Sequence, residues 1–357
     1  MSDAPADQAP LFDAALLAPG TPGRARAASR VQAAVPTPEG LALAHQLPKR
    51  LYLGTSSWSF PGWAGLVWDG DYAENRLSKD GLGAYARHPL LRTVSLDRAF
   101  YRPLSASQYA RFAAQVPPDF RFVVKAPSLV ADALVRSPDG RGRMPNPAFL
   151  NAELALREFA EPALDGLGER IGALVLQISP LPGALLAELP ALIERLGALL
   201  AALPRLQPRA PDGVLALEVR DAAFLSPEHA PHLARVLRAV RQASGNPVTY
   251  CLGLHARLPP IEVQLPLLRA LWPGPLVCRW NLHRRHGAHG YETAKSLYTP
   301  FNVLADPDPA TRRVLADVIA GTCGAGQTAY VTINNKAEGS APWSVLALAR
   351  ELAAKLP

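Results

Sequence analysis

The sequence predicts an α/β protein that folds as a single (β/α)8 barrel of the TIM type behind a disordered N-terminal tail. Eight short apolar segments rich in β-branched residues recur along the 357 residues. Stretches rich in Ala and Leu, with apolar residues at helical spacing, separate most of these segments. Alternating strands and helices indicate a parallel sheet, and eight repeats favour a closed barrel.

Seven of the eight expected strands end in, or lead straight into, polar or charged side chains. The expected strands are Leu51–Trp58, Thr93–Asp97, Arg121–Pro127, Gly172–Ser179, Val214–Asp221, Pro247–Leu254, Leu276–Leu282 and Ala329–Asn335. The clearest expected helices are Ser105–Val116, Leu150–Gly166, Leu185–Leu203 and Trp343–Leu356. Because barrels of this type carry their chemistry at the carboxyl ends of the strands, the polar strand ends are the candidate site residues.

Residues 1–48 form the expected disordered tail, and residues 49–357 form the barrel domain. The tail is rich in Ala and Pro and has no strand signal. Its apolar run Leu11–Ala18 is stopped by Pro19 and follows acidic residues, so no secretory signal is expected. No other segment is apolar enough to cross a bilayer. We therefore expect a soluble, cytoplasmic protein.

The chain is basic, with 37 Lys and Arg against 30 Asp and Glu and a formal net charge of +7. Many of the arginines are scattered over expected helices, which favours a solvated basic surface. A patch that binds phosphate or nucleic acid is the alternative. Three widely spaced cysteines, Cys251, Cys278 and Cys323, fit reduced thiols in the core better than a disulfide framework.

Aromatic and acidic side chains follow the first two expected strands. Trp58 lies in a serine-rich turn, where it can line a ligand pocket or pack a turn whose serine caps a helix. Asp97 is a candidate general base or metal ligand, and an ion pair to Arg98 or Arg102 is the alternative. Tyr101 follows and is a candidate substrate contact.

Three charged residues lie at the ends of the third and fifth expected strands. Lys125 can act as a Schiff-base nucleophile if burial lowers its pKa, or it can hold an anion while charged. A structural ion pair with Glu218 is the alternative. Glu218 and Arg220 are two residues apart, so they point to the same side of their strand. If that side is inward, they form a charged pair at the barrel mouth.

The fourth and seventh strand ends argue against a glycosidase. That reaction uses two carboxyl groups about 5–10 Å apart, and many barrel glycosidases carry them on strands four and seven. Here those strands offer Gln177 and Arg279. Together with Asn281 after strand seven and His255 after strand six, these residues are candidate substrate-binding side chains.

The loop after strand seven contains His283, His286 and His289, a spacing that is common in metal sites. The loop has no acidic or Cys companion for them, whereas a closed zinc site needs a fourth ligand. No metal site is expected. An anion-binding loop is the better interpretation, because such barrels often hold phosphate after strands seven and eight.

Asn334, Asn335 and Lys336 follow strand eight, just before the last expected helix. Their amides and ammonium group offer donors to an oxyanion or a phosphate. The alternative is an Asx turn in which Ser340 is the N-cap and Pro342 lies in the first turn of the helix. The two interpretations are compatible.

Taken in order, the strand-end motifs resemble those of the YecE-like family, domain of unknown function 72. The matching segments run from about residue 51 to residue 350. They are Gly54–Phe60 with Trp63, Phe100–Arg102, Phe122–Lys125, Leu176–Gln177 with Pro180, Glu218–Arg220, Arg279 and Tyr330–Asn335. The resemblance implies a TIM barrel and no established activity.

The chain departs from the family pattern at two places. Ser95 and Asp97 stand where the family commonly shows Glu-x-Asn ahead of Phe-Tyr, and Asn281 stands where a strand-seven histidine is common. These replacements weaken any mechanism that depends on that Glu or His.

The favoured function is a metal-independent enzyme that acts on a small anionic or polyhydroxy substrate at the carboxyl face of the barrel. Glu218 or Asp97 would move a proton, and Lys125 would stabilise developing charge or act as the nucleophile. The expected substrate-binding residues are Trp58, Tyr101, Gln177, Arg220, His255, Arg279, Asn281, Asn334, Asn335 and Lys336. No cofactor and no membrane partner are expected.

Two other functions stay open. A nucleic-acid-processing enzyme is one, since some nucleases use the same barrel, an argument from fold analogy alone. A non-catalytic protein that binds a small ligand in the same pocket is the other.

Overall fold

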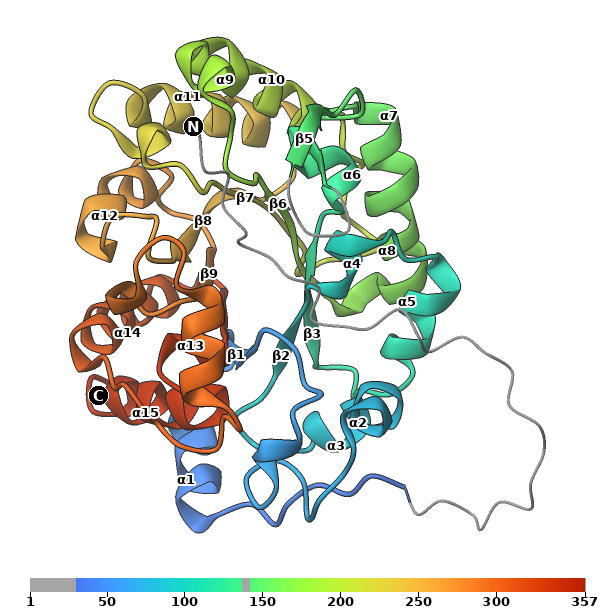
Figure 1. Cartoon of the computed structure of the whole chain (residues 1–357), viewed down its shortest axis with the longest axis vertical. Coiled ribbons are helices and arrows are strands. Elements are labelled where there is room, and N and C mark those ends of the chain that lie inside the picture. Colours follow the sequence, from blue (N-terminus) through green and yellow to red (C-terminus); the bar gives the residue numbers. More distant parts are fainter. Residues whose placement is uncertain (1–29, 137–141, 357) are drawn as a thin grey trace.

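The computed structural model shows a closed barrel of parallel strands surrounded by helices, as the alternation of strand and helix predicts (Figure 1). It describes residues 30–136 and 142–356. The strands pair around the barrel in the order β1-β10-β9-β8-β7-β6-β3-β2, and β2 closes onto β1. They are β1 (Leu51–Thr55), β2 (Thr93–Leu96), β3 (Arg121–Lys125), β6 (Ile171–Gln177), β7 (Val214–Glu218), β8 (Val248–Leu254), β9 (Leu276–Trp280) and β10 (Ala329–Ile333).

Helices cover the outside of the barrel and alternate with its strands (Figure 1). They are α1 (Pro38–Gln46), α2 (Glu74–Asp80), α3 (Leu82–Tyr85), α4 (Arg98–Tyr101), α5 (Ala106–Ala113), α6 (Ser128–Ala131), α7 (Ala152–Ala155), α8 (Glu161–Leu167), α9 (Gly183–Ala187), α10 (Leu189–Ala202), α11 (Ala230–Ser244), α12 (Ile261–Ala270), α13 (Tyr291–Tyr298), α14 (Pro309–Gly324) and α15 (Ala341–Ala353). The four stretches expected most clearly as helices are helical, but Leu150–Gly166 is divided between α7 and α8, and Leu185–Leu203 between α9 and α10. In the described ranges, no helix has both the length and the apolar character that a membrane crossing requires.

Local signals in the sequence account for several helix ends. The Ser105 side chain accepts a hydrogen bond from the Gln108 backbone N–H, and the Gln108 side chain accepts one from the Ser105 N–H, so a capping box starts α5. Asp308 caps α14 by accepting from the Thr311 N–H at 3.0 Å. Gly245 ends α11 in the left-handed conformation that glycine adopts without strain.

The barrel has an apolar interior at the amino-terminal half of its strands. Small and β-branched side chains from successive strands fill it, capped by the stacked rings of Tyr52 and Tyr330, whose centroids are 5.0 Å apart. A second and larger core lies between the outer faces of the strands and the surrounding helices. Both faces of the sheet are therefore buried, which explains why the strands read as continuous apolar runs.

The predicted disordered tail, residues 1–48, is too long at its carboxyl end. Residues 30–48 are ordered against the barrel, and the rest of the expected tail, residues 1–29, lies outside the described residues. Thr37 accepts from the Gly40 N–H at 3.0 Å and Pro38 occupies the first helical position, so the Thr-Pro pair starts α1. Glu39 forms an ion pair with Arg350 of α15 at 2.6 Å. Pro38, one of the prolines on which the prediction of disorder rested, therefore begins a helix.

A two-stranded antiparallel sheet follows the third barrel strand and was not expected. It consists of β4 (Leu134–Arg136) and β5 (Gly142–Pro145). The Asn146 amide donates to the backbone carbonyls of Leu129 and Asp132, both at 2.8 Å, and fixes the return of the chain. The strands are too short, and too rich in charge and Pro, to show a period-two pattern.

Gly54 of β1 provides a test of the barrel closure. A Cβ at this position would lie 1.8 Å from the Thr93 carbonyl oxygen of β2, a backbone atom that cannot move without opening the sheet. We expect Gly54→Ala to lower the free energy of unfolding by about 3 kcal/mol or more, measured by urea titration. Gly321→Ala in α14, where the added Cβ meets open space, is the control and should raise it by roughly 0.5–1 kcal/mol. Equal effects would contradict this account of β1.

Candidate functional site

Four polar side chains form one inward-facing layer at the carboxyl ends of the strands. Alternate residues of a strand face the barrel axis, so a side chain two positions after an interior residue also points inward. Lys125, Gln177, Glu218 and Arg279 each follow such a residue. The interior residues that precede them are Val123, Val175, Ala216 and Val277. The polar layer therefore lies directly above the apolar interior.

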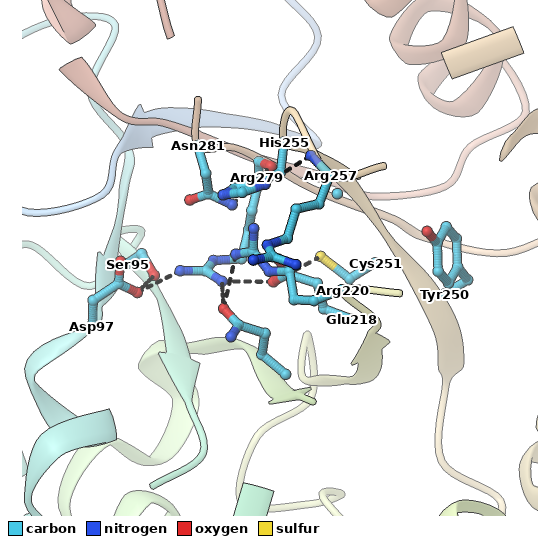
Figure 2. Close-up of polar contacts among 12 residues, drawn as sticks. Ser95, Asp97, Glu218, Arg220, Tyr250, Cys251, His255, Arg257, Arg279 and Asn281 are labelled. Carbon is cyan, nitrogen blue, oxygen red and sulfur yellow. Dashed lines mark hydrogen bonds and ion pairs between the residues drawn. The ribbon is translucent and has the colours of Figure 1, made fainter. Parts of the chain in front are cut away.

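Arg279 of β9 lies at the centre of this layer, between two carboxylates (Figure 2). Its Nη2 donates to Asp97 Oδ1 at 2.6 Å, and its Nη1 donates to Glu218 Oε2 at 2.6 Å and to Gln177 Oε1 at 3.0 Å. Burial disfavours the charged guanidinium, but the two carboxylates outweigh burial and raise the pKa of Arg279 well above its usual range. Arg279 therefore stays charged.

Glu218 and Arg220 form the charged pair that their spacing predicts. Arg220 Nη2 lies 2.7 Å from Glu218 Oε1 and donates to Gln177 Oε1 at 2.9 Å. Glu218 is 0% exposed, and each of its oxygens contacts a guanidinium. Among the described residues its ion-pair partners are arginines, so the expected alternative of an ion pair with Lys125 is wrong. Gln177 bridges the two guanidinium groups.

Asp97 is the more accessible of the two acids. Its side chain is 26% exposed, and its Oδ1 accepts from both Arg279 and the Ser95 hydroxyl, the latter at 2.7 Å. Oδ2 receives no hydrogen bond from a described residue. Burial would raise the pKa of Asp97, but the positive charges of Arg279 and Lys125 hold it below its ordinary value. An ionised oxygen of Asp97 therefore faces the mouth. The expected alternative pairing with Arg98 or Arg102 is replaced by the pairing with Arg279.

Lys125 of β3 has an aromatic neighbour in place of a counter-ion. Its Nζ lies 3.4 Å from the ring centroid of Phe100, and it forms no ion pair with a carboxylate of the described residues. The side chain is 5% exposed. Burial and the charge of Arg279 lower the pKa of Lys125 to about 7, against a weaker opposite effect of Asp97. The amine can therefore exchange a proton near neutral pH.

A second buried lysine follows β10. Lys336 is 1% exposed, and its Nζ lies 4.1 Å from the ring centroid of Tyr291 and 5.7 Å from that of Phe301. Burial lowers its pKa to about 8. Asn334 accepts from the Lys336 backbone N–H at 3.0 Å, which is the expected Asx turn. Asn335 instead accepts from Trp63 Nε1 and from the backbone N–H that starts α15, so it holds the loop together.

His255 and Asn281 lie on the side of the mouth formed by β8 and β9 (Figure 2). His255 Nδ1 accepts from the Arg257 backbone N–H at 3.1 Å. Burial, with the charges of Arg220 and Arg257, lowers the pKa of His255 to about 2. The imidazole is therefore neutral and carries its proton on Nε2. Asn281 donates to the Arg279 backbone carbonyl at 3.2 Å.

Two predicted ligand contacts, Trp58 and Tyr101, lie apart from the central layer. Trp58 is buried, donates to the Leu77 carbonyl at 3.0 Å and packs edge-on against Phe112. Its side chain therefore belongs to the packed turn, which is the alternative that the sequence left open. Tyr101 is 42% exposed and contacts Phe100 with an edge-to-face geometry. It lies at the rim, next to the ring that holds Lys125.

The three loop histidines do not converge on one point. His283 caps its own turn, His286 lies 2.6 Å from the Tyr298 hydroxyl, and His289 contacts Arg257 at 3.4 Å. Across residues 30–136 and 142–356, no three His, Cys, Asp or Glu side chains are placed to share a metal ion.

Sequence reasoning missed the aromatic rings that hold the two lysines. Phe100 comes just after Asp97, and Tyr291 begins α13. A phenylalanine or tyrosine near a strand end is too common to indicate a contact with a lysine of another strand. Ser95, which binds Asp97, had a usable signal because it lies two residues before Asp97 on the same side of β2.

Comparison with known proteins identifies a family that matches this chain. The model described as "Protein of unknown function DUF72" matches residues 52–357. A DUF72 family protein from Enterococcus faecalis V583 is similar in structure, with a TM-score of 0.56 and 17% identity over 85% of this chain and 95% of that chain. A DUF72 family protein from Thermotoga maritima MSB8 has a TM-score of 0.52 and 19% identity over 85% and 98% of the two chains. No curated protein matches the chain.

The burial of Lys125 gives a pH-dependent prediction for stability. At pH 6 the lysine is charged in both the folded and the unfolded protein, so the folded protein carries the full cost of burying the charge. As the pH rises from about 7, the folded value, towards 10.5, the unfolded value, that cost disappears. We expect Lys125→Met to raise the free energy of unfolding by about 1–3 kcal/mol at pH 6, and by less at pH 9.

Denaturant titrations at the two pH values check this prediction. Lys355→Met is the matched control, because Lys355 lies at the surface in an ion pair with Asp317, and it should change stability by less than about 1 kcal/mol. A Lys125→Met variant that is less stable than wild type at pH 6 would show that the ammonium has a stabilising partner.

The hydrogen bond to His255 gives a prediction for its tautomer. Because Nδ1 accepts from a backbone N–H and burial lowers the pKa to about 2, we expect one neutral form with the proton on Nε2 from pH 8 to about pH 4. Nitrogen-15 NMR of histidine-labelled protein measures this, and His255→Gln identifies the signal. A titration midpoint near pH 6.5 would refute the assignment.

Proposed function

The chain belongs to the DUF72 family, and from the geometry of its barrel mouth we propose that it is an enzyme acting on a small anionic or polyhydroxy substrate. The observation that carries the proposal is a buried excess of positive charge at the strand ends. Four cations and two carboxylates gather there, namely Lys125, Arg220, Arg279, Lys336, Asp97 and Glu218.

The excess charge resides on the two lysines. Asp97 and Glu218 both pair with guanidinium groups, which leaves the ammonium groups of Lys125 and Lys336 without an ion pair to a described carboxylate. A buried cation without a counter-ion destabilises a fold. An anionic ligand at the mouth supplies the missing partner and gains from the low dielectric of the site. This supports a site that is completed by its ligand.

Asp97 is the residue best placed to act as the general base. It is ionised, partly exposed, and has one oxygen that accepts no hydrogen bond from a described residue. Glu218 is fully buried, and arginines contact both of its oxygens. We therefore assign Glu218 to holding Arg220 and Arg279 in place, and Asp97 to proton transfer.

Lys125 and His255 supply the complementary electrophilic groups. Lys125 can donate a proton or a hydrogen bond near neutral pH, and His255 presents a neutral Nε2–H donor. In the proposed step, Asp97 Oδ2 takes a proton from the substrate, and the negative charge left on a substrate oxygen is stabilised by Lys125 and His255. Fixed donors in a dry site are the usual source of such stabilisation. The step moves one proton and needs no further reactant.

Replacing the proposed base gives the direct test. The wild-type protein is incubated with a mixture of small phosphorylated, carboxylated and polyhydroxy metabolites, and mass spectrometry or proton–deuterium exchange at carbon identifies the compound that is converted. We expect Asp97→Asn to lower its turnover by about 100-fold or more, because the amide cannot accept the proton. The binding of the same compound should weaken by less than tenfold.

Asp212→Asn is the matched control for this experiment. Asp212 pairs with Arg121 at 2.7 Å at the amino-terminal end of the barrel, so its replacement should leave turnover within twofold. A compound that binds, is released unchanged by wild type and shows no exchange would point to a binding protein instead of an enzyme. Turnover that survives in Asp97→Asn would remove Asp97 from the mechanism.

A further inference from the structure

We propose that the ligand of this site carries two separate anionic groups, one held by Lys125 and the other by Lys336, with Asp97 between them. The inference rests on the proposed function, because it concerns the same mouth, and it names the class of substrate. That class is a small molecule with two oxyanion groups, such as a dicarboxylate or a phosphorylated acid. A single carboxylate or phosphate group would leave one lysine uncompensated.

The two lysines occupy separate places around the mouth. Lys125 ends β3 and Lys336 follows β10, and β2 and β1 lie between these strands in the barrel. Lys125 lies in the electrostatic field of Arg279, Asp97, Arg220 and Glu218. Lys336 lies in the field of Glu292, Lys295 and Asp97. Asp97, which ends β2, is the one residue that both sets share. In the order of the strands, Asp97 after β2 therefore lies between Lys125 of β3 and Lys336 after β10.

Each ammonium group rests on its own aromatic surface. The ring of Phe100, from α4, lies under Lys125, and the ring of Tyr291, from α13, lies beside Lys336. Such contacts favour a cation while leaving its N–H donors free for an anion. They also fix the position of each cation before a ligand arrives, which reduces the entropy lost on binding. The structure thus contains two preformed anion contacts.

The charge balance agrees with a dianion. Two arginines and two carboxylates neutralise each other in the centre of the layer, and the two lysines carry the remaining positive charge when both are protonated. A ligand with two negative charges neutralises the mouth, whereas a monoanion leaves a buried positive charge. Because Asp97 lies between the two anchors, the part of the ligand that connects its anionic groups is placed next to the base. The reacting carbon is therefore expected between the two anionic groups.

A matched ligand series tests the inference by calorimetry on the full-length protein. The probes are the dicarboxylates malonate, succinate, glutarate and adipate, each compared with the monocarboxylate of the same carbon number. We expect at least one dicarboxylate to bind about tenfold or more tightly than its monocarboxylate. The reason is that its second carboxylate adds one charge-assisted hydrogen bond, which lowers the dissociation constant by about that factor. Lys336→Met and Lys125→Met should each reduce this ratio to about twofold or less.

Lys355→Met is the control, because Lys355 lies at the surface, paired with Asp317 and away from the mouth, and it should leave the ratio unchanged. Lys336→Gln provides a second variant if Lys336→Met has a lower melting temperature. Equal binding of mono- and dicarboxylates by wild type, or an unchanged ratio in Lys336→Met, overturns the inference.

The two proposals can fail separately. If monocarboxylates bind as well as dicarboxylates, and the Asp97→Asn variant still loses turnover, the enzyme proposal stands without the two-anchor inference. If none of the carboxylate probes binds and no compound of the metabolite mixture is converted, both proposals are wrong.

Discussion

The buried guanidinium of Arg279 is the group around which the barrel mouth is organised. Three strands must bring acceptors to it, because Asp97 comes from the end of β2, Gln177 from β6 and Glu218 from β7. A buried charge that loses one partner costs about 3–5 kcal/mol, so these contacts keep the strand ends in a single arrangement. The site and the closure of the barrel therefore depend on the same interactions.

This arrangement divides the charged residues into two groups with different roles. The arginines are permanently charged and planar, which suits them to hold carboxylates in fixed positions. The two lysines of the mouth form no ion pair with a carboxylate of the described residues, and aromatic rings contact them instead. Their pKa values fall because burial disfavours the ammonium form. The fold thus tolerates two unfavourable charges at the place where an anionic ligand would compensate them, as proteins commonly do at functional sites.

Much of the barrel could be predicted because its signals are local. An apolar run of five to seven residues and a following amphipathic helix can be recognised without knowledge of the rest of the chain. The spacing of Glu218 and Arg220 predicted that they share one side of their strand, and the structure showed that this side faces inward. The prediction of disorder up to residue 48 was wrong because it rested on the Ala- and Pro-rich composition. In the structure, Thr37 and Pro38 start helix α1. The pair of strands β4 and β5 was missed because these strands are shorter than any reliable pattern.

The sequence by itself determined the class of fold and which polar residues end the strands, because both depend on periods of two and 3.6 residues within a few positions. Only the tertiary structure decided how the charges pair. Asp97 and Arg279 are 182 residues apart, and Lys125 faces Phe100 instead of Glu218. Closure of the barrel sets the distances between charged side chains of different strands. In a low dielectric the nearest partner dominates the electrostatic energy, so these distances determine which acid is neutralised and which amine is left to bind a ligand.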